Sequence, residues 1–209
     1  MMTLTELEQD ALTEIFNIGV GVAADALYQL VGEQVPLSVP VVELTSQHHA
    51  KSHYTGREKR QLCAIRQTYQ GEFTTEAILM FPEDNGLELV RMMVGVNLPD
   101  EQLTEMATDA MAELGNIILN AVISNLSSTL KLPLEGSLPT VSVVSAATIF
   151  GPPHANRDED EDAAPVLALM IDFELSANQV RGYLAFLLDE ASCEKLVSRL
   201  TAYIDGSAA

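Results

Sequence analysis

An internal repeat constrains the fold of this chain more than any other feature of its sequence. Residues 10–44 align with residues 109–143 at a constant offset of 99 positions, without a gap. A repeat of this kind predicts one structural unit that occurs twice, as two half-domains sharing one core. Residues that are identical in the two copies include Asp10 and Asp109, Ala11 and Ala110, Glu14 and Glu113, Asn17 and Asn116, Ile18 and Ile117, Leu27 and Leu126, and Pro40 and Pro139.

The expected helices and strands repeat in the same order. Apolar residues at helical spacing predict a long helix at the start of each half, over 4–31 and 102–131. Each helix is followed by three strand-like segments and a shorter amphipathic helix. These ranges are 37–46, 61–70, 72–81 and 83–95 in the first half, and 138–149, 165–175, 180–188 and 189–204 in the second.

This order predicts the fold class. We expect an α+β fold, a pseudo-twofold repeat of αβββα halves that form a largely antiparallel sheet with two long exposed helices. The chain should be a single domain over 1–209, with halves at about 1–100 and 101–209. The apolar residues at helical spacing are Leu12, Ile15, Gly19, Val22, Ala26 and Leu30 in the first helix, and Met111, Leu114, Ile118 and Ala121 in the second. In the first helix, the stripe through Leu12, Ile15, Gly19 and Ala26 is expected to face the sheet.

Composition limits the expected partners and the expected location of the protein. The chain is 47% hydrophobic and carries 30 acidic against 11 basic residues, a formal charge of −19. A surface with this much negative charge repels the phosphate groups of nucleic acids and anionic lipids. We therefore expect neither a nucleic-acid partner nor a membrane partner. The beginning of the chain lacks the pattern of a secretory signal, and Cys63 and Cys193 lie in apolar stretches typical of reduced core thiols. We expect a cytoplasmic protein without a membrane-spanning segment.

Two segments look irregular. Residues 49–60 are basic and predict a loop or hairpin tip, and residues 151–164 contain an acidic run typical of a solvated loop. His49 and His53 have the spacing of zinc ligands on a helix, but the segment favours strand and loop and lacks a cysteine or carboxylate set. No metal site is expected.

A polar stripe follows one side of each long helix. Asp10, Glu14 and Asn17 fall within an arc of roughly 60° on an α-helix, and Gly21 continues the stripe. Asp109, Glu113, Asn116 and Asn120 form the same stripe in the second half. Such residues on one helix are most often a solvated face, and the recurrence indicates common ancestry of the halves without indicating chemistry.

Both copies contain the string Asp-x3-Glu-x2-Asn-x22-Pro, ending at Pro40 and Pro139. This string resembles the signature of the CheC–CheX–FliY family of chemotaxis phosphatases, and the flanks NIGVGVAADAL at 17–27 and ELGNIILNA at 113–121 are also similar to that family. The resemblance covers the whole chain. It implies hydrolysis of the aspartyl phosphate on a CheY-like response regulator, which itself holds Mg²⁺, so no cofactor of the chain's own is implied.

The resemblance also implies roles for individual residues. Asn17 and Asn116 would orient the attacking water, and Glu14 and Glu113 would bind the lysine of the receiver's active site. The remaining positions have lesser expected roles, with partner contacts at Asp10, Gly21, Asp109 and Asn120, and structural roles at Pro40 and Pro139.

The two copies differ beside the motif. Phe16 in the first half corresponds to Gly115, and Gly19 corresponds to Ile118. We hypothesise that the small Gly115 leaves the second site at least as active as the first.

Two other functions stay open at this stage. The chain could be a non-catalytic adaptor of the same fold that binds CheD or phosphorylated CheY, or a relative of the flagellar switch proteins. Intact Glu–Asn pairs in both halves favour catalysis. Because two sites occur within one chain, a monomer is expected.

Overall fold

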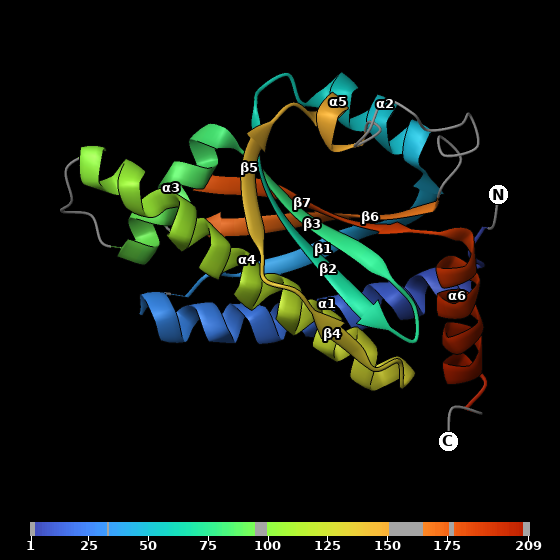
Figure 1. The fold of residues 1–209 in the computed structure, drawn as a ribbon. Helices are drawn as coiled ribbons and strands as arrows, with labels where there is room; N and C mark the ends of the chain where they lie inside the picture. Colours follow the sequence, from blue (N-terminus) through green and yellow to red (C-terminus); the bar gives the residue numbers. More distant parts are fainter. Residues whose placement is uncertain (1–2, 33, 95–99, 151–164, 176–177, 207–209) are drawn as a thin grey trace.

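The computed structural model describes residues 3–32, 34–94, 100–150, 165–175 and 178–206. Figure 1 shows helices on both sides of a central sheet. The helices and strands are α1 Glu6–Val31, β1 Leu37–Ser46, α2 Gln47–Arg57, β2 Leu62–Gly71, β3 Thr75–Pro82, α3 Glu83–Val94, α4 Asp100–Leu130, β4 Leu134–Gly136, β5 Thr140–Val144, α5 Ala146–Ile149, β6 Pro165–Leu175, β7 Asn178–Leu188 and α6 Glu190–Ile204.

The strands form one antiparallel sheet whose order reflects the repeat. The order is β1-β6-β7-β3-β2-β4, with β5 also paired to β2. If β1 is exchanged with β4 and β5, β2 with β6, and β3 with β7, the order reads the same from the other end. The outermost strand of each half therefore pairs with a strand of the other half. The predicted α+β fold, a pseudo-twofold repeat with an antiparallel sheet, is confirmed.

Local sequence sets the ends of α1. Thr5 and Glu8 form a capping box, in which the Thr5 hydroxyl accepts from the Glu8 amide and the Glu8 carboxylate accepts from the Thr5 amide at 2.8 Å. Gly32 ends the helix with a φ of 74°, a left-handed conformation that favours glycine. These signals fix the length of the helix that carries the first polar stripe.

The core lies mainly between the sheet and the layer that contains α1 and α4 (Figure 1). The buried face of α1 was predicted with the correct period but not everywhere at the correct positions. Val22 and Leu30 are about half exposed, whereas Phe16, Val20 and Leu27 are buried in their place. The buried stripe therefore turns slightly around the helix, because α1 packs on both the sheet and α4. A smaller core on the opposite face lies beneath α2 and α5.

Two sequence-based predictions of local structure are wrong. Most of 49–60 belongs to the helix α2, because the Ser46 hydroxyl caps its first turn and Ala50 and Tyr54 bury one side of it. The expected strand 138–149 is divided into β5 and the short helix α5, which Ser145 caps. The acidic loop predicted at 151–164 lies outside the described residues.

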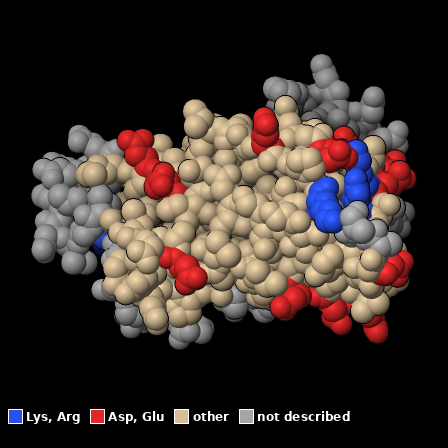
Figure 2. All heavy atoms as spheres, turned by 90° about the horizontal axis from the view of Figure 1, so that it is seen from below, with Lys and Arg blue, Asp and Glu red and all other residues tan. Residues whose placement is uncertain are grey.

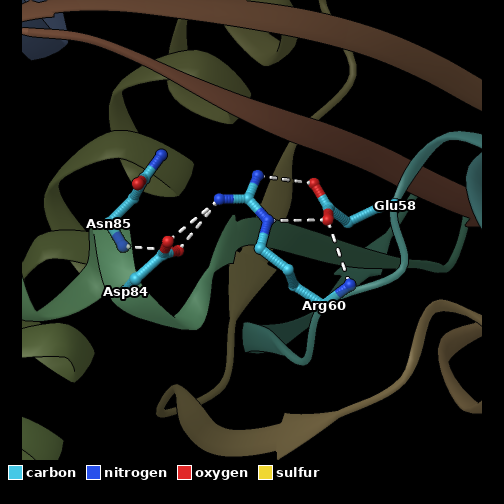
Figure 3. Close-up of polar contacts among 4 residues, drawn as sticks. All are labelled: Glu58, Arg60, Asp84 and Asn85. Carbon is cyan, nitrogen blue, oxygen red and sulfur yellow. Dashed lines mark hydrogen bonds and ion pairs between the residues drawn. The ribbon is translucent and has the colours of Figure 1, made fainter.

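An ion-pair cluster joins the start of β2 to α3 (Figure 3). Arg60 donates through Nε and Nη2 to the buried carboxylate of Glu58, both at 2.9 Å, and through Nη1 to Asp84 at 3.0 Å. Asp84 Oδ1 also accepts from the backbone amide of Asn85. The Arg60 guanidinium lowers the pKa of Glu58 below its ordinary value. The cluster therefore fixes the first turn of α3 against the sheet.

Of the helices in the described ranges, α1 alone reaches the length and hydropathy of a membrane-crossing helix, although no such segment was expected. Its Leu12, Ile15 and Phe16 side chains are fully buried in the core, so we interpret it as a core helix. Cys63 and Cys193 are buried free thiols, and burial raises the pKa of Cys63 to about 11. Both cysteines are therefore unreactive parts of the core.

Candidate functional site

The two long helices pack side by side in opposite directions (Figure 1). The Asn125 side chain of α4 donates to the backbone oxygen of Ile15 in α1 at 2.6 Å. Four residues further along α1, a Cβ on Gly19 would lie 2.9 Å from the Val122 Cα. These contacts place residue 116 beside residue 24 or 25, so Asn17 and Asn116 are separated by about 10 Å along the helix axes.

The first site consists of Glu14 and Asn17 on α1. The Glu14 side chain is exposed, and Asn17 is half-buried one turn away. Asn17 Nδ2 donates to the backbone oxygen of Thr13 at 3.0 Å, which orients its carboxamide along the helix. Asp10 and Gly21 are exposed on the same stripe, and a Cβ on Gly21 would have no neighbour within 4 Å. The structure thus brings all four predicted residues to one open helix face.

The second site consists of Glu113 and Asn116 on α4. Glu113 and Asp109 are exposed, and Asn116 and Asn120 are half-buried. Asn116 Oδ1 accepts from Asn120 Nδ2 at 2.6 Å. Asn120, expected to be a partner contact, therefore holds the neighbouring motif residue through a side-chain hydrogen bond.

Asn120 also connects the second site to the sheet. The Tyr69 hydroxyl of β2 lies 2.9 Å from Asn120 Oδ1 and 2.9 Å from Gln67 Oε1, and Gln67 Nε2 donates to the backbone oxygen of Ser137 at 2.7 Å. We call Gln67, Tyr69 and Asn120 the Tyr69 network. Sequence reasoning missed Gln67 and Tyr69 because they alternate within a buried strand and resemble core residues. The available signal was a polar residue, Gln67, between Ile65 and Tyr69 on one face of the strand.

The glycines next to the motif serve helix packing. A Cβ on Gly115 would lie 2.3 Å from Ile65 Cγ2, so this glycine lets α4 approach β2 closely. Its counterpart Phe16 is buried and stacks on Phe186 with ring centroids 5.6 Å apart. Both residues are buried, and the hypothesis that the second site is at least as active as the first stays a prediction.

The two motif prolines lie at breaks in the outer strands. Pro40 is within β1, where the pairing with β6 shifts register between Ser38 and Val41. Pro139 immediately precedes β5, in the break after β4. Both prolines lie in or beside the outer strands and not in the turns that directly follow the long helices, so their expected structural role stays a prediction. Proline has no amide hydrogen to donate, so it fits an edge strand at a break in the ladder.

The surface over α1 and α4 has few basic residues. Figure 2, which views this side, shows a largely uncharged centre with acidic side chains around it and most of the visible Lys and Arg at one end. Ile18 and Val22, which lie on one side of the first stripe, are 49% and 52% exposed. The described residues contain no group of three His, Cys, Asp or Glu side chains arranged to hold a metal ion, although α2 places His49 and His53 one turn apart. The surface therefore combines exposed carboxylates, carboxamides and apolar side chains.

Comparisons with known proteins relate this surface to chemotaxis. The family model described as chemotaxis phosphatase CheX matches residues 63–154, which include the second site and the whole Tyr69 network. CheY-P phosphatase CheC of Bacillus subtilis is 25% identical over 202 residues, 95% of this chain and 96% of that protein.

Two further matches extend the similarity to flagellar proteins. The flagellar motor switch phosphatase FliY of Bacillus subtilis is 24% identical over 158 residues, which cover 75% of this chain but 41% of that protein. The crystal structure of Thermotoga maritima FliY has a TM-score of 0.75 and 19% identity, and the match covers 97% of this chain and all of that one. At this identity the structural match supports the fold alone.

Proposed function

Because this chain belongs to the CheC–CheX–FliY family of chemotaxis phosphatases, we propose that it hydrolyses the aspartyl phosphate of a CheY-like response regulator. The observation that carries this proposal is the duplicated Glu–Asn pair, an exposed glutamate and a half-buried asparagine on each of two adjacent helices. One relative, CheC of Bacillus subtilis, is named a CheY-P phosphatase, and another, FliY, is named a flagellar motor switch phosphatase. The expected location is the cytoplasm, where this substrate would be found.

The chemistry requires little of this chain beyond positioning. Water attacks the phosphorus, the bond from phosphorus to the aspartate oxygen breaks, and inorganic phosphate and a free carboxylate result. The receiver supplies Mg²⁺ and a lysine that balance the charge of the phosphoryl group, so what it lacks is a water held in line with the leaving oxygen. A carboxamide oxygen of Asn17 or Asn116 accepts a hydrogen bond from such a water, and its NH₂ group donates toward the phosphoryl oxygens. Holding the water in this way contributes about 3 kcal/mol, roughly a hundredfold in rate.

Binding would come from the residues around each asparagine. Glu14 and Glu113 are exposed one turn before their asparagines and can accept a charge-assisted hydrogen bond from the receiver's lysine. Ile18 and Val22 add exposed apolar area beside the first site. The low density of Lys and Arg on this side (Figure 2) leaves the approach of a basic partner surface unopposed.

The direct test follows loss of phosphate from a phosphorylated CheY-like receiver. The proteins compared are the wild type, Asn17→Ala, Asn116→Ala and the double variant. We expect acceleration by the wild type, partial loss in each single variant and loss of about a hundredfold in the double variant. Ser128→Ala, which changes an exposed residue of α4 outside the motif, is the matched control and should retain the wild-type rate.

The same proteins test the alternative function. If the wild type binds the phosphorylated receiver or CheD tightly but does not accelerate phosphate loss, the chain is an adaptor and the proposal is wrong. Binding of CheD and the monomeric state stay predictions, and co-purification and sedimentation would test them.

A further inference from the structure

The Tyr69 network belongs to the second site alone. The offset of 99 places Gly21 at the position of Asn120. Tyr69 pairs with Gly136 in the sheet, and Phe173 pairs with Leu37, the counterpart of Gly136. By the same register, Ile171 corresponds to Gln67. Glycine, phenylalanine and isoleucine have no side-chain hydrogen-bonding group, so all three network positions are non-polar in the first half.

The network is built tightly into the fold. Tyr69 and Gln67 are each 2% exposed. A Cβ on Gly136 would lie 2.8 Å from the Tyr69 ring and 3.1 Å from Gln67 Nε2, so only glycine leaves room for both side chains. Burial also raises the pKa of the Tyr69 phenol, which keeps the hydroxyl protonated. The network is thus a fixed row of donors and acceptors that ends at Asn116.

The hydrogen bonds give each side chain in the row a defined orientation. Gln67 Nε2 donates to the backbone oxygen of Ser137 at 2.7 Å and to Asn120 Oδ1 at 3.4 Å. The Tyr69 hydroxyl lies 2.9 Å from the carboxamide oxygens of Gln67 and Asn120. Asn120 Oδ1 therefore faces the sheet, and Asn120 Nδ2 donates to Asn116 Oδ1 at 2.6 Å. The row thus ends on the oxygen of the Asn116 carboxamide.

We propose that Gln67, Tyr69 and Asn120 are positioning residues that fix the orientation of the Asn116 carboxamide, which contacts the attacking water at the second site. This inference rests on the proposed phosphatase function. Asn17 in the first site is held by its own helix, through the Thr13 oxygen, and lacks the counterpart residues of this network. Both sites therefore present the same carboxamide group. The second site turns over faster, because its carboxamide is already held in place before the receiver binds.

The test uses Tyr69→Phe, which removes one hydroxyl and restores the residue type found at 173. In an Asn17→Ala background only the second site acts, and we expect its kcat to fall about tenfold with KM for the phosphorylated receiver unchanged. In an Asn116→Ala background only the first site acts, and the same substitution should leave its rate unchanged. Thermal unfolding of each variant verifies that the proteins are folded.

The outcomes separate this inference from the proposed function. An unchanged kcat in the Asn17→Ala background, or an equal loss at both sites, overturns the positioning role while phosphatase activity stands. If the wild type has no activity, the positioning role is tested by the NMR resonances of the Asn116 side-chain amide. Tyr69→Phe should shift those resonances and leave the Asn17 amide resonances in place, and no shift at Asn116 overturns the inference.

Discussion

The two long helices carry the same exposed residues but are packed into the molecule by different ones. In α1 the close contact is with the other helix, where Gly19 meets Val122, and the bulky Phe16 stacks on Phe186. In α4 the close contact is with the sheet, where Gly115 meets Ile65. The motif positions were retained in both copies while the residues that hold each helix diverged.

The closing helices of the two halves differ in the same way. The first turn of α3 is held by a residue outside the helix, since Arg60 donates to Asp84 (Figure 3). The first turn of α6 is capped by its own Asp189, whose Oδ1 accepts from the Ser192 amide at 2.7 Å. Equivalent positions in the two halves therefore keep the same exposed residues, whereas the contacts that hold each helix in place differ.

The largest expected effect comes from filling the contact between α4 and the sheet. Gly115→Ala places a methyl group 2.3 Å from Ile65 Cγ2 and should lower the free energy of unfolding by about 2–3 kcal/mol. Gly21→Ala, in the open face of α1, is the matched control and should raise it by about 0.5–1 kcal/mol through helix propensity. Urea unfolding measures both, and equal effects at the two glycines would contradict the difference between the helices.

A smaller loss is expected from the Arg60 cluster, and it should depend on pH. Arg60 lowers the pKa of Glu58, so the pair stabilises the folded state fully above about pH 4.5, and this contribution is lost as the pH falls through the lowered pKa. Because Arg60 is half exposed, Arg60→Met should cost about 1–2 kcal/mol at neutral pH. The difference from the wild type in urea unfolding should narrow below pH 4.5.

Lys59→Met is the control for this pH dependence. It removes a neighbouring exposed cation whose Nζ donates to the Thr55 oxygen, and it should change the free energy of unfolding by less than about 0.5 kcal/mol. A gap between the wild type and Arg60→Met that stays constant at acid pH would exclude the Glu58 pair as its cause.

The smallest expected loss is at the start of α6. Asp189→Ala removes the capping oxygen and should cost about 1 kcal/mol in thermal or urea unfolding. Asp189→Asn keeps an acceptor at this position and should retain most of the stability. If both substitutions cost the same, the charge of Asp189 rather than its hydrogen bond would stabilise the helix.

The fold was largely predictable from the sequence because the same order of expected helices and strands occurs twice in it. The errors fall where tertiary packing outweighs local composition. The polar segment 49–60 became a helix because Ala50 and Tyr54 are only one turn apart and can be buried together. The stripe on α1 shifted because α4 covers part of the helix, which no single-helix periodicity can reveal.

The sequence predicted the motif residues of the candidate site but not the buried residues that support them. The motif placed Glu14, Asn17, Glu113 and Asn116 on open faces, and the structure locates them there. The buried residues of the site were not predictable, since Tyr69 is distant in sequence from its partner Asn120 and their contact depends on how β2 lies beneath α4. A hydrogen bond between residues 51 positions apart leaves no trace in the spacing of either segment.

The exchange of outer strands between the halves bears on how the chain could have evolved. Two separate but identical chains assembled in this way would receive every substitution at both sites at once, so neither site could change without the other. A covalent link between the copies removes that restriction. Once the two halves lay within one polypeptide, equivalent positions could hold different residues, such as Gly21 at one site and Asn120 at the other. The link permits specialisation that an assembly of identical chains could not support.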